Sequence, residues 1–157
     1  MRILIISPHN DDALIGCFKV IAKGFLNPEK IYIYFDKTGF EESKEREEEA
    51  HKFAKAFNLE EVDSIFFTLK EVDTILAPSP DSTHPLHKYW AWKALDYSDK
   101  RLIYYSTDMT EWWVRPLSSF SRKVKREFLD RFFPIEADLW RCDGKYYMFE
   151  GYVEVLV

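Results

Sequence analysis

Apolar and polar positions alternate along the chain in a way that predicts strands and helices in turn. Residues 3–6 and 31–35 form continuous apolar runs, each typical of a strand that is buried on both faces. Residues 13–25 carry apolar side chains at helical spacing, and residues 42–57 form a highly charged segment with an apolar helical stripe. The chain therefore begins with a β-α-β-α pattern.

The same alternation continues toward the C-terminus. The expected elements are strands at 64–69, 74–77 and 102–105, helices at 85–95 and 118–132, and an edge strand or hairpin at 146–157. Pro78 and Pro80 mark a loop, because proline excludes both ladder pairing and a helix interior. Strands that alternate with helices form parallel βαβ units, so the sequence predicts an α/β fold: a three-layer αβα sandwich with a Rossmann-like, mostly parallel sheet.

The composition fits one globular domain over residues 1–157. Hydrophobic residues make up 46% of the chain and charged residues 31%, which excludes wholesale disorder. No apolar run approaches the length of about 20 residues that a membrane span needs. The N-terminus lacks the pattern of a signal peptide, so we expect a cytoplasmic protein.

The net charge of −5 argues against a nucleic-acid partner. One expected helix is nevertheless basic, and its cationic residues are Arg122, Lys123, Lys125, Arg126 and Arg131. We expect these side chains to form a solvated face. His51, on the charged helix nearer the N-terminus, is expected to be exposed as well.

Polar residues with metal-binding chemistry follow two of the predicted strands. Function in open α/β sheets lies at the carboxyl ends of the strands, and three of the four histidines lie in two such segments. His9 and Asp12 are three residues apart, as are His84 and His87, a spacing that puts two side chains on one side of a turn. Imidazole and carboxylate groups bind divalent metals, and Asp11 remains beside them as a candidate general base.

Simpler structural roles exist for these residues taken singly. Asp11 or Asp12 is a good N-cap for the helix that follows, and His84 beside Pro85 is a common way to begin a helix. Histidines and acidic residues with ligand spacing occur together at two strand ends, however, and this combination favours a metal site over separate structural roles.

Nucleophilic catalysis has less support. Cys17 falls on an apolar helical stripe and is expected in the core, and Ser7 and Ser82 lack a G-x-S-x-G elbow.

Four segments match the order and spacing of a known family's motifs. They are SPHNDDA at 7–13, REEE at 46–49, HPLH at 84–87 and FEGY at 149–152. The chain thereby resembles the LmbE-like/PIG-L superfamily of zinc-dependent N-deacetylases, in which these positions carry HPDD, R-x-x-E, HPDH and a closing Glu-containing strand. The first and third motifs together are the most specific part of the resemblance.

The resemblance implies a role for each polar residue. It implies that zinc is bound by His9, Asp12 and His87. It implies catalytic roles for Asp11, as general base, and for His84, which stabilises the tetrahedral intermediate or handles a proton. It implies that the substrate pocket is shaped by Arg46 and Glu49.

The chain departs from the family's pattern beside the implied ligands. Asn10 replaces a proline, Ala13 replaces an acid and Leu86 replaces an aspartate. None of these positions is a ligand, so the departures change the surroundings of the metal rather than its binding. The chain is also shorter than most members, and we therefore expect a metal pocket that is shallow and open on one side.

Four tryptophans lie near the segments that form the site, namely Trp90, Trp92, Trp112 and Trp113. Tryptophan most often packs in a core, but each of these could stack on a sugar ring. Trp112 and Trp113 follow a strand end, so one of them is expected to wall the pocket.

The expected function is zinc-dependent removal of an N-acetyl group, from an N-acetylglucosamine-type amino sugar or a glycoconjugate. Two alternatives stay open: an amidase on another N-acyl conjugate, and a non-catalytic metal-binding or structural protein. Asp11 favours an enzyme, since a structural zinc site has no use for a spare base. The short chain favours a homo-oligomer whose interface lies close to residues 78–87 and 106–115.

Overall fold

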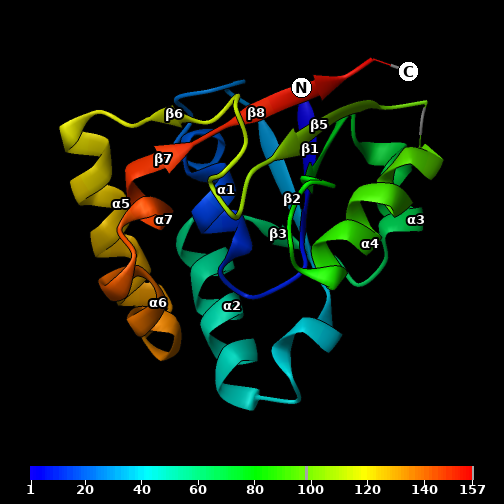
Figure 1. The fold of residues 1–157 in the computed structure, drawn as a ribbon. Coiled ribbons are helices and arrows are strands. Elements are labelled where there is room, and N and C mark those ends of the chain that lie inside the picture. The colour runs from blue at the N-terminus through cyan, green and yellow to red at the C-terminus, as the bar shows by residue number, and fades with distance from the viewer. Residues whose placement is uncertain (98, 157) are drawn as a thin grey trace.

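The computed structural model describes residues 1–97 and 99–156 (Figure 1). A six-stranded sheet runs through the molecule in the order β3-β2-β1-β4-β5-β8. Its strands are β1 (Arg2–Ser7), β2 (Lys30–Phe35), β3 (Glu60–Glu61), β4 (Thr74–Pro78), β5 (Arg101–Tyr105) and β8 (Tyr152–Val155). The neighbouring strands are parallel except for β8, which is antiparallel to β5.

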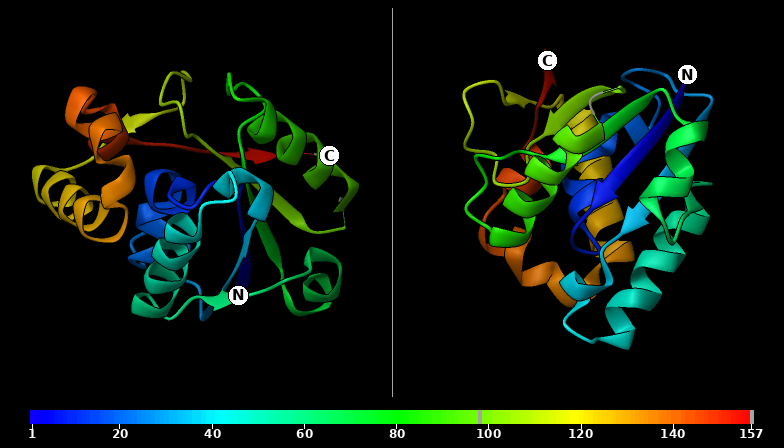
Figure 2. Two further views of the ribbon diagram at one scale, coloured as in Figure 1. Left: turned by 90° about the horizontal axis from the view of Figure 1, so that it is seen from below. Right: turned by 90° about the vertical axis from the view of Figure 1, so that its right-hand side faces the viewer.

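Helices cover both faces of this sheet, as Figure 2 shows. One face carries α1 (Asp12–Ile21), α2 (Lys44–Ala56) and α5 (Ser119–Phe132), and the other carries α3 (Ile65–Thr68) and α4 (Pro85–Ala94). Ile3 and Ile5 pack into the first core and Leu4 and Ile6 into the second, and all four are fully buried. A strand that serves two cores needs apolar residues on both faces, which explains the unbroken run at 3–6. The predicted three-layer αβα sandwich is confirmed.

Residues 64–69 do not form the strand that the sequence predicted. They are helical: Ser64 precedes α3, and the Thr68 hydroxyl donates a hydrogen bond of 2.8 Å to the Ser64 carbonyl oxygen. Phe66 and Phe67 point into solvent rather than into a sheet core. The sheet position beside β2 is taken by the two residues of β3. The prediction was wrong because a short apolar run does not by itself distinguish a strand from a helical turn.

Short elements fill the remaining connections. They are η1 (Lys37–Phe40), η2 (Leu69–Glu71), η3 (Leu95–Tyr97), η4 (Pro134–Glu136), α6 (Ala137–Cys142), α7 (Lys145–Met148), β6 (Arg115–Pro116) and β7 (Phe149–Glu150). The edge strand expected within 146–157 is confirmed in β8, although the first residues of that range belong to α7. No helix in the described part of the chain is long and apolar enough to cross a membrane.

The strand order creates a switch point between β1 and β4. From β1 the chain continues outward to β2 and β3, and it then returns to β4 on the opposite side of β1. The loops after β1 and β4 therefore lead to opposite faces of the sheet and leave a crevice between them, where ligands bind in folds of this kind. These two loops lead to the histidines that the sequence singled out.

Candidate functional site

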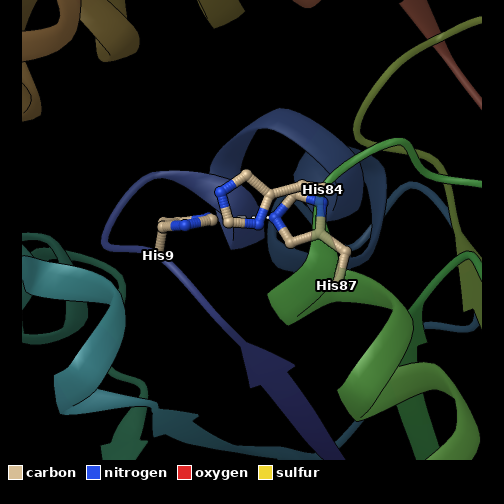
Figure 3. Close-up of side chains that lie close together, drawn as sticks. All are labelled: His9, His84 and His87. Atoms are coloured by element: carbon tan, nitrogen blue, oxygen red, sulfur yellow. Dashed lines mark hydrogen bonds between the residues drawn. The ribbon is translucent and has the colours of Figure 1, made fainter.

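Three histidines from the two loops meet at the switch point. His9 follows β1, His84 precedes α4 and His87 lies in its first turn, and one ring nitrogen of each lies within 4.8 Å of the others (Figure 3). The rings of His9 and His84 meet edge to face, with 4.5 Å between their centroids. These residue types at one point could hold a metal ion.

Local hydrogen bonds fix both loops. The Ser7 hydroxyl donates to the His9 carbonyl oxygen at 2.8 Å and accepts from the Ala13 N–H at 3.1 Å, which closes the loop around His9. His84 caps α4, because its Nδ1 accepts the Leu86 N–H at 3.2 Å. His84 therefore caps the helix, as expected for a residue at that position. Because its Nδ1 is used in this cap, only its Nε2 is free for other chemistry.

Asp12 joins the cluster at its buried side. Its Oδ2 lies 2.9 Å from His9 Nδ1 and 3.0 Å from His87 Nε2, and these two nitrogens lie 2.9 Å apart. Zinc ligands at about 2.0–2.1 Å in a tetrahedron lie about 3.3–3.4 Å from one another, so this triangle would have to open by only about 0.4 Å on each side to become a ligand set. The structure thus brings together the three side chains for which the resemblance implied a ligand role.

Contacts behind His87 set the orientation of its ring. The hydroxyl oxygens of Ser82 and Thr107 both lie 2.9 Å from His87 Nδ1, and both hydroxyls donate at 3.3 Å to Asp108 Oδ1. A hydroxyl that donates to a carboxylate has its lone pairs free, so Nδ1 carries the proton and donates to Ser82 and Thr107. His87 Nε2 then points a lone pair at His9 and Asp12.

The cluster therefore requires a positive charge at its centre. Lone pairs on neighbouring ligand atoms repel one another unless a proton or a metal cation lies between them. Burial opposes the charged form of His9, but the charge and hydrogen bond of Asp12 outweigh it and raise the pKa of His9 to about 9. Burial also opposes the ionised form of Asp12, yet His87 and His9 hold the pKa of this carboxyl well below its usual range. These three donor atoms fit a divalent metal ion. When no metal ion is bound, a proton supplies the positive charge instead.

Asp11 stands beside the cluster and is not part of it. It occupies the N-cap position of α1, but its side chain makes no capping hydrogen bond. The carboxylate is 6% exposed and faces the cavity. Burial, together with the negative charges of Asp12 and Glu136, raises the pKa of Asp11 to about 7. A carboxylate with such a pKa is suited to taking up a proton near neutral pH.

A cavity of about 330 Å³ opens over these residues. Its lining includes the three histidines, Asp11, Asp12, Arg46, Thr107, Asp108, Glu136, Leu139 and Tyr146. Arg46 spans one wall, where its guanidinium lies 2.7 Å from Glu136 and 3.3 Å from Glu41. The carboxyl edge of the sheet thus holds a small, strongly charged site.

Three residues expected near the substrate do not line this cavity. Glu49 lies behind it: one carboxylate oxygen accepts from Asn10 Nδ2 at 2.9 Å and the other accepts the Ile135 N–H at 3.1 Å. Glu49 thereby ties α2 to the loop that carries His9 and to the cavity wall. Trp112 is 82% exposed, and Trp113 is half-buried against Gly151. Tyr146 does line the cavity.

Among the other side chains considered in the sequence, some are buried or exposed as expected and others are not. Cys17 is fully buried, as its apolar stripe predicted, and His51 is exposed. Trp90 is a core residue whose indole N–H donates to Asp36, whereas Trp92 is 64% exposed.

Sequence reasoning did not identify the residues that support His87. Thr107 and Asp108 follow β5 with only Ser106 between, so their place near a strand end was the available signal. Glu136, Leu139 and Tyr146 come from the C-terminal segment after α5, where no motif marked them.

No family model matches the chain, and the comparison with curated proteins finds no match. Solved structures are similar. N,N′-diacetylchitobiose deacetylase from Pyrococcus horikoshii has a TM-score of 0.69 and 14% identity, covering 98% of this chain and 83% of that one. A deacetylase of the teicoplanin biosynthesis pathway has a TM-score of 0.64 and 12% identity, covering 93% and 89% of the two chains.

The same fold also occurs with another reaction. GalB, the 4-carboxy-2-hydroxymuconate hydratase from Pseudomonas putida KT2440, has a TM-score of 0.61 and 14% identity, covering 99% of this chain and 96% of that one. Identities this low show a shared fold. The expected likeness in fold to N-deacetylases is therefore confirmed, and the reaction depends on the residues of the site rather than on the fold.

Proposed function

We propose that this chain is a zinc-dependent hydrolase that removes an N-acetyl group from an amino sugar or a glycoconjugate. The observation that carries the proposal is the triangle of His9 Nδ1, Asp12 Oδ2 and His87 Nε2, with the Asp11 carboxylate beside it in one cavity. Three protein ligands and a free base form a catalytic rather than a structural set. Similar folds include several deacetylases, one of them described in a zinc-inhibited form.

Each residue of the site has a separate role in the proposed amide hydrolysis. A bound divalent ion would lower the pKa of a coordinated water and polarise the acyl carbonyl. Asp11 takes the proton that water loses as the new carbon–oxygen bond forms. It then returns this proton to the nitrogen as the carbon–nitrogen bond breaks, so acetate and an amine are released. His84 Nε2 faces the same space and is placed to donate to the developing oxyanion.

A serine hydrolase is the competing interpretation of the same contacts. Asp12, His87 and Ser82 form a continuous acid–imidazole–hydroxyl chain, with Asp12 on Nε2 and Ser82 on Nδ1. A nucleophile must reach its substrate, but Ser82 is fully buried and does not line the cavity. Ser82 therefore serves to orient His87.

Ser82→Ala distinguishes these two roles. If Ser82 orients a metal ligand, the variant is expected to bind zinc about 10–100-fold more weakly and to regain turnover at high zinc concentration. Zinc competition titration and acetate release measure the two quantities. Ser79→Ala is the matched control, since Ser79 is equally buried in the same loop but contacts Asp81. Loss of turnover with unchanged zinc affinity would instead identify Ser82 as the nucleophile.

The charge of the cavity selects among N-acyl substrates. Its lining carries the carboxylates of Asp11, Asp12, Glu41, Asp108 and Glu136 and one guanidinium, that of Arg46. A divalent ion leaves this balance negative, so neutral and cationic substrates are favoured over anionic ones.

The test is acetate release from a panel of acetylated compounds together with the zinc content of the purified protein. N-acetylglucosamine and a mono-acetylated diamine are expected to be hydrolysed with a kcat/KM at least about tenfold above that of N-acetylglucosamine 6-phosphate, which corresponds to about 1.4 kcal/mol of repulsion. The difference is expected to shrink in high salt. A preference for the phosphorylated sugar would contradict the charge argument, and zinc-free protein without acetate release would contradict the proposed function.

Two further expectations from the sequence belong to this proposal. A homo-oligomer with an interface near residues 106–115 is consistent with the exposure of Trp112 in that loop. A cytoplasmic location stays a prediction of the sequence.

A further inference from the structure

Helix α1, which begins with Asp12, is broken beneath the site. Cys17 has non-helical angles, with φ −123° and ψ 22°. In a regular helix the Lys19 N–H would donate to the Ile15 carbonyl oxygen. Here the Lys19 N–H donates at 2.9 Å to Glu150 Oε1, and the Ile15 oxygen accepts from Lys125 Nζ. The donor and the acceptor of one helical hydrogen bond are thus each paired with a side chain instead, Glu150 from β7 and Lys125 from α5.

The two inserted side chains form a buried ion pair. Lys125 is fully buried and Glu150 is 2% exposed, and Lys125 Nζ lies 3.8 Å from Glu150 Oε2. The ammonium also donates at 3.1 Å to the Phe149 carbonyl oxygen. Lys125 is the exception to the solvated basic face that the sequence predicted for α5, because it points inward toward the break. A buried ion pair is weak as a source of stability, since apolar residues of similar size stabilise a core as well.

The first half of α1 also packs closely against the sheet. At Gly16 an added Cβ would lie 2.1 Å from Tyr105 Cδ2 and 2.8 Å from the Ser106 carbonyl oxygen, so the helix lies directly against the end of β5. The next residue, Thr107, contacts His87. The half-helix that carries Asp12 is therefore held at one point by β5 and at the other by Lys125 and Glu150.

We infer that Lys125 and Glu150 are a positioning pair for the metal site. By replacing one hydrogen bond of α1, they hold its first half so that Asp12 meets His87 and Asp11 faces the cavity. A straight helix would keep the Lys19–Ile15 bond and would rotate its first turn relative to the second. The assignment to a metal site rests on the proposed function, but the positioning of Asp12 against His9 and His87 does not.

The first test compares Lys125→Met with Lys123→Met, an exposed neighbour on the same helix. Cobalt(II) serves as the probe, through its affinity and its visible absorption spectrum. Lys125→Met is expected to bind cobalt at least about tenfold more weakly with an altered spectrum, and Lys123→Met to match the wild type. In the metal-free protein, the imidazole ¹⁵N shifts of His9 and His87 are expected to change in Lys125→Met alone, because they report the contacts with Asp12.

A second set of variants separates positioning from stability. Glu150→Gln keeps an oxygen that accepts the Lys19 N–H and is expected to retain cobalt affinity within about threefold, whereas Glu150→Leu should lose it about tenfold. The double variant Lys125→Met/Glu150→Leu removes both buried charges, so it is expected to fold and still to bind cobalt weakly.

Two outcomes would overturn the inference: wild-type affinity and spectrum in the double variant, or unchanged histidine shifts in Lys125→Met. If the wild type binds no cobalt, the proposed function fails, while the histidine shifts still decide the role of the pair.

Discussion

Asp11→Asn is expected to lower the rate of deacetylation by about 10²–10⁴-fold and, at the same time, to stabilise the metal-free protein. The loss of rate follows from the proposed role, because an amide keeps the shape of the carboxylate but cannot take up a proton. Metal affinity should change little, since Asp11 makes no contact with the three ligand atoms.

The gain in stability follows from the burial of the charge. Desolvation and the charges of Asp12 and Glu136 raise the pKa of Asp11 to about 7, well above the usual value for an aspartate. The stability linked to this group is complete below about pH 4 and is lost as the pH rises to about 7. At about 1.4 kcal/mol per pKa unit, the ionised group lowers the free energy of unfolding at pH 8 by up to about 4 kcal/mol. Asparagine removes this penalty.

Urea unfolding at pH 8 in the presence of a chelator measures the stability, and acetate release measures the rate. Asp138→Asn, an exposed acid on α6, is the control and should change neither quantity. A variant that keeps the wild-type rate would show that Asp11 is not the base. A variant that is less stable than the wild type would show that the carboxylate has a structural role instead.

The sequence could predict that His9 and His87 meet because topology restricts where strand ends lie. His9 and His87 are far apart along the chain, yet each follows a parallel strand, and β1 and β4 are neighbours at the switch point. Ligand chemistry at two strand ends was enough to predict convergence. The same reasoning could not select Asp108, because an isolated aspartate after a strand has no partner spacing that marks it.

Interior polar groups were the main failure of sequence reasoning. Lys125 lies in a run of basic residues, and such a run is usually solvated. Its burial depends on a gap in α1 that exists only once α5 and β7 pack against that helix. Trp112 shows the converse: an aromatic residue at a strand end suggested a pocket wall, but the short loop points it into solvent. Both outcomes are set by tertiary packing, which local pattern does not encode.

Asp12→Asn is expected to abolish metal binding and activity together, and to destabilise the metal-free protein above pH 4. The side chain is a ligand in the proposal, and a neutral amide is a poorer ligand for zinc than a carboxylate. Rates are expected to fall by at least about 10³-fold, and added zinc should not restore them. Chelation of the wild type should give the same loss, with recovery on addition of zinc.

The stability change of this variant has the opposite sign to that of Asp11→Asn. Burial works against the ionised form of Asp12, but the charges and hydrogen bonds of His87 and His9 hold its pKa well below the usual range. A depressed acid contributes stability that is present above its unfolded pKa and is lost as the pH falls through its folded pKa. Removing Asp12 therefore removes stability at neutral pH, and the effect should disappear in strong acid. The same substitution at two adjacent positions thus shifts unfolding in urea in opposite directions. Shifts of the same sign would show that one of the two roles is misassigned, and reversed signs would show that the roles of Asp11 and Asp12 have been exchanged.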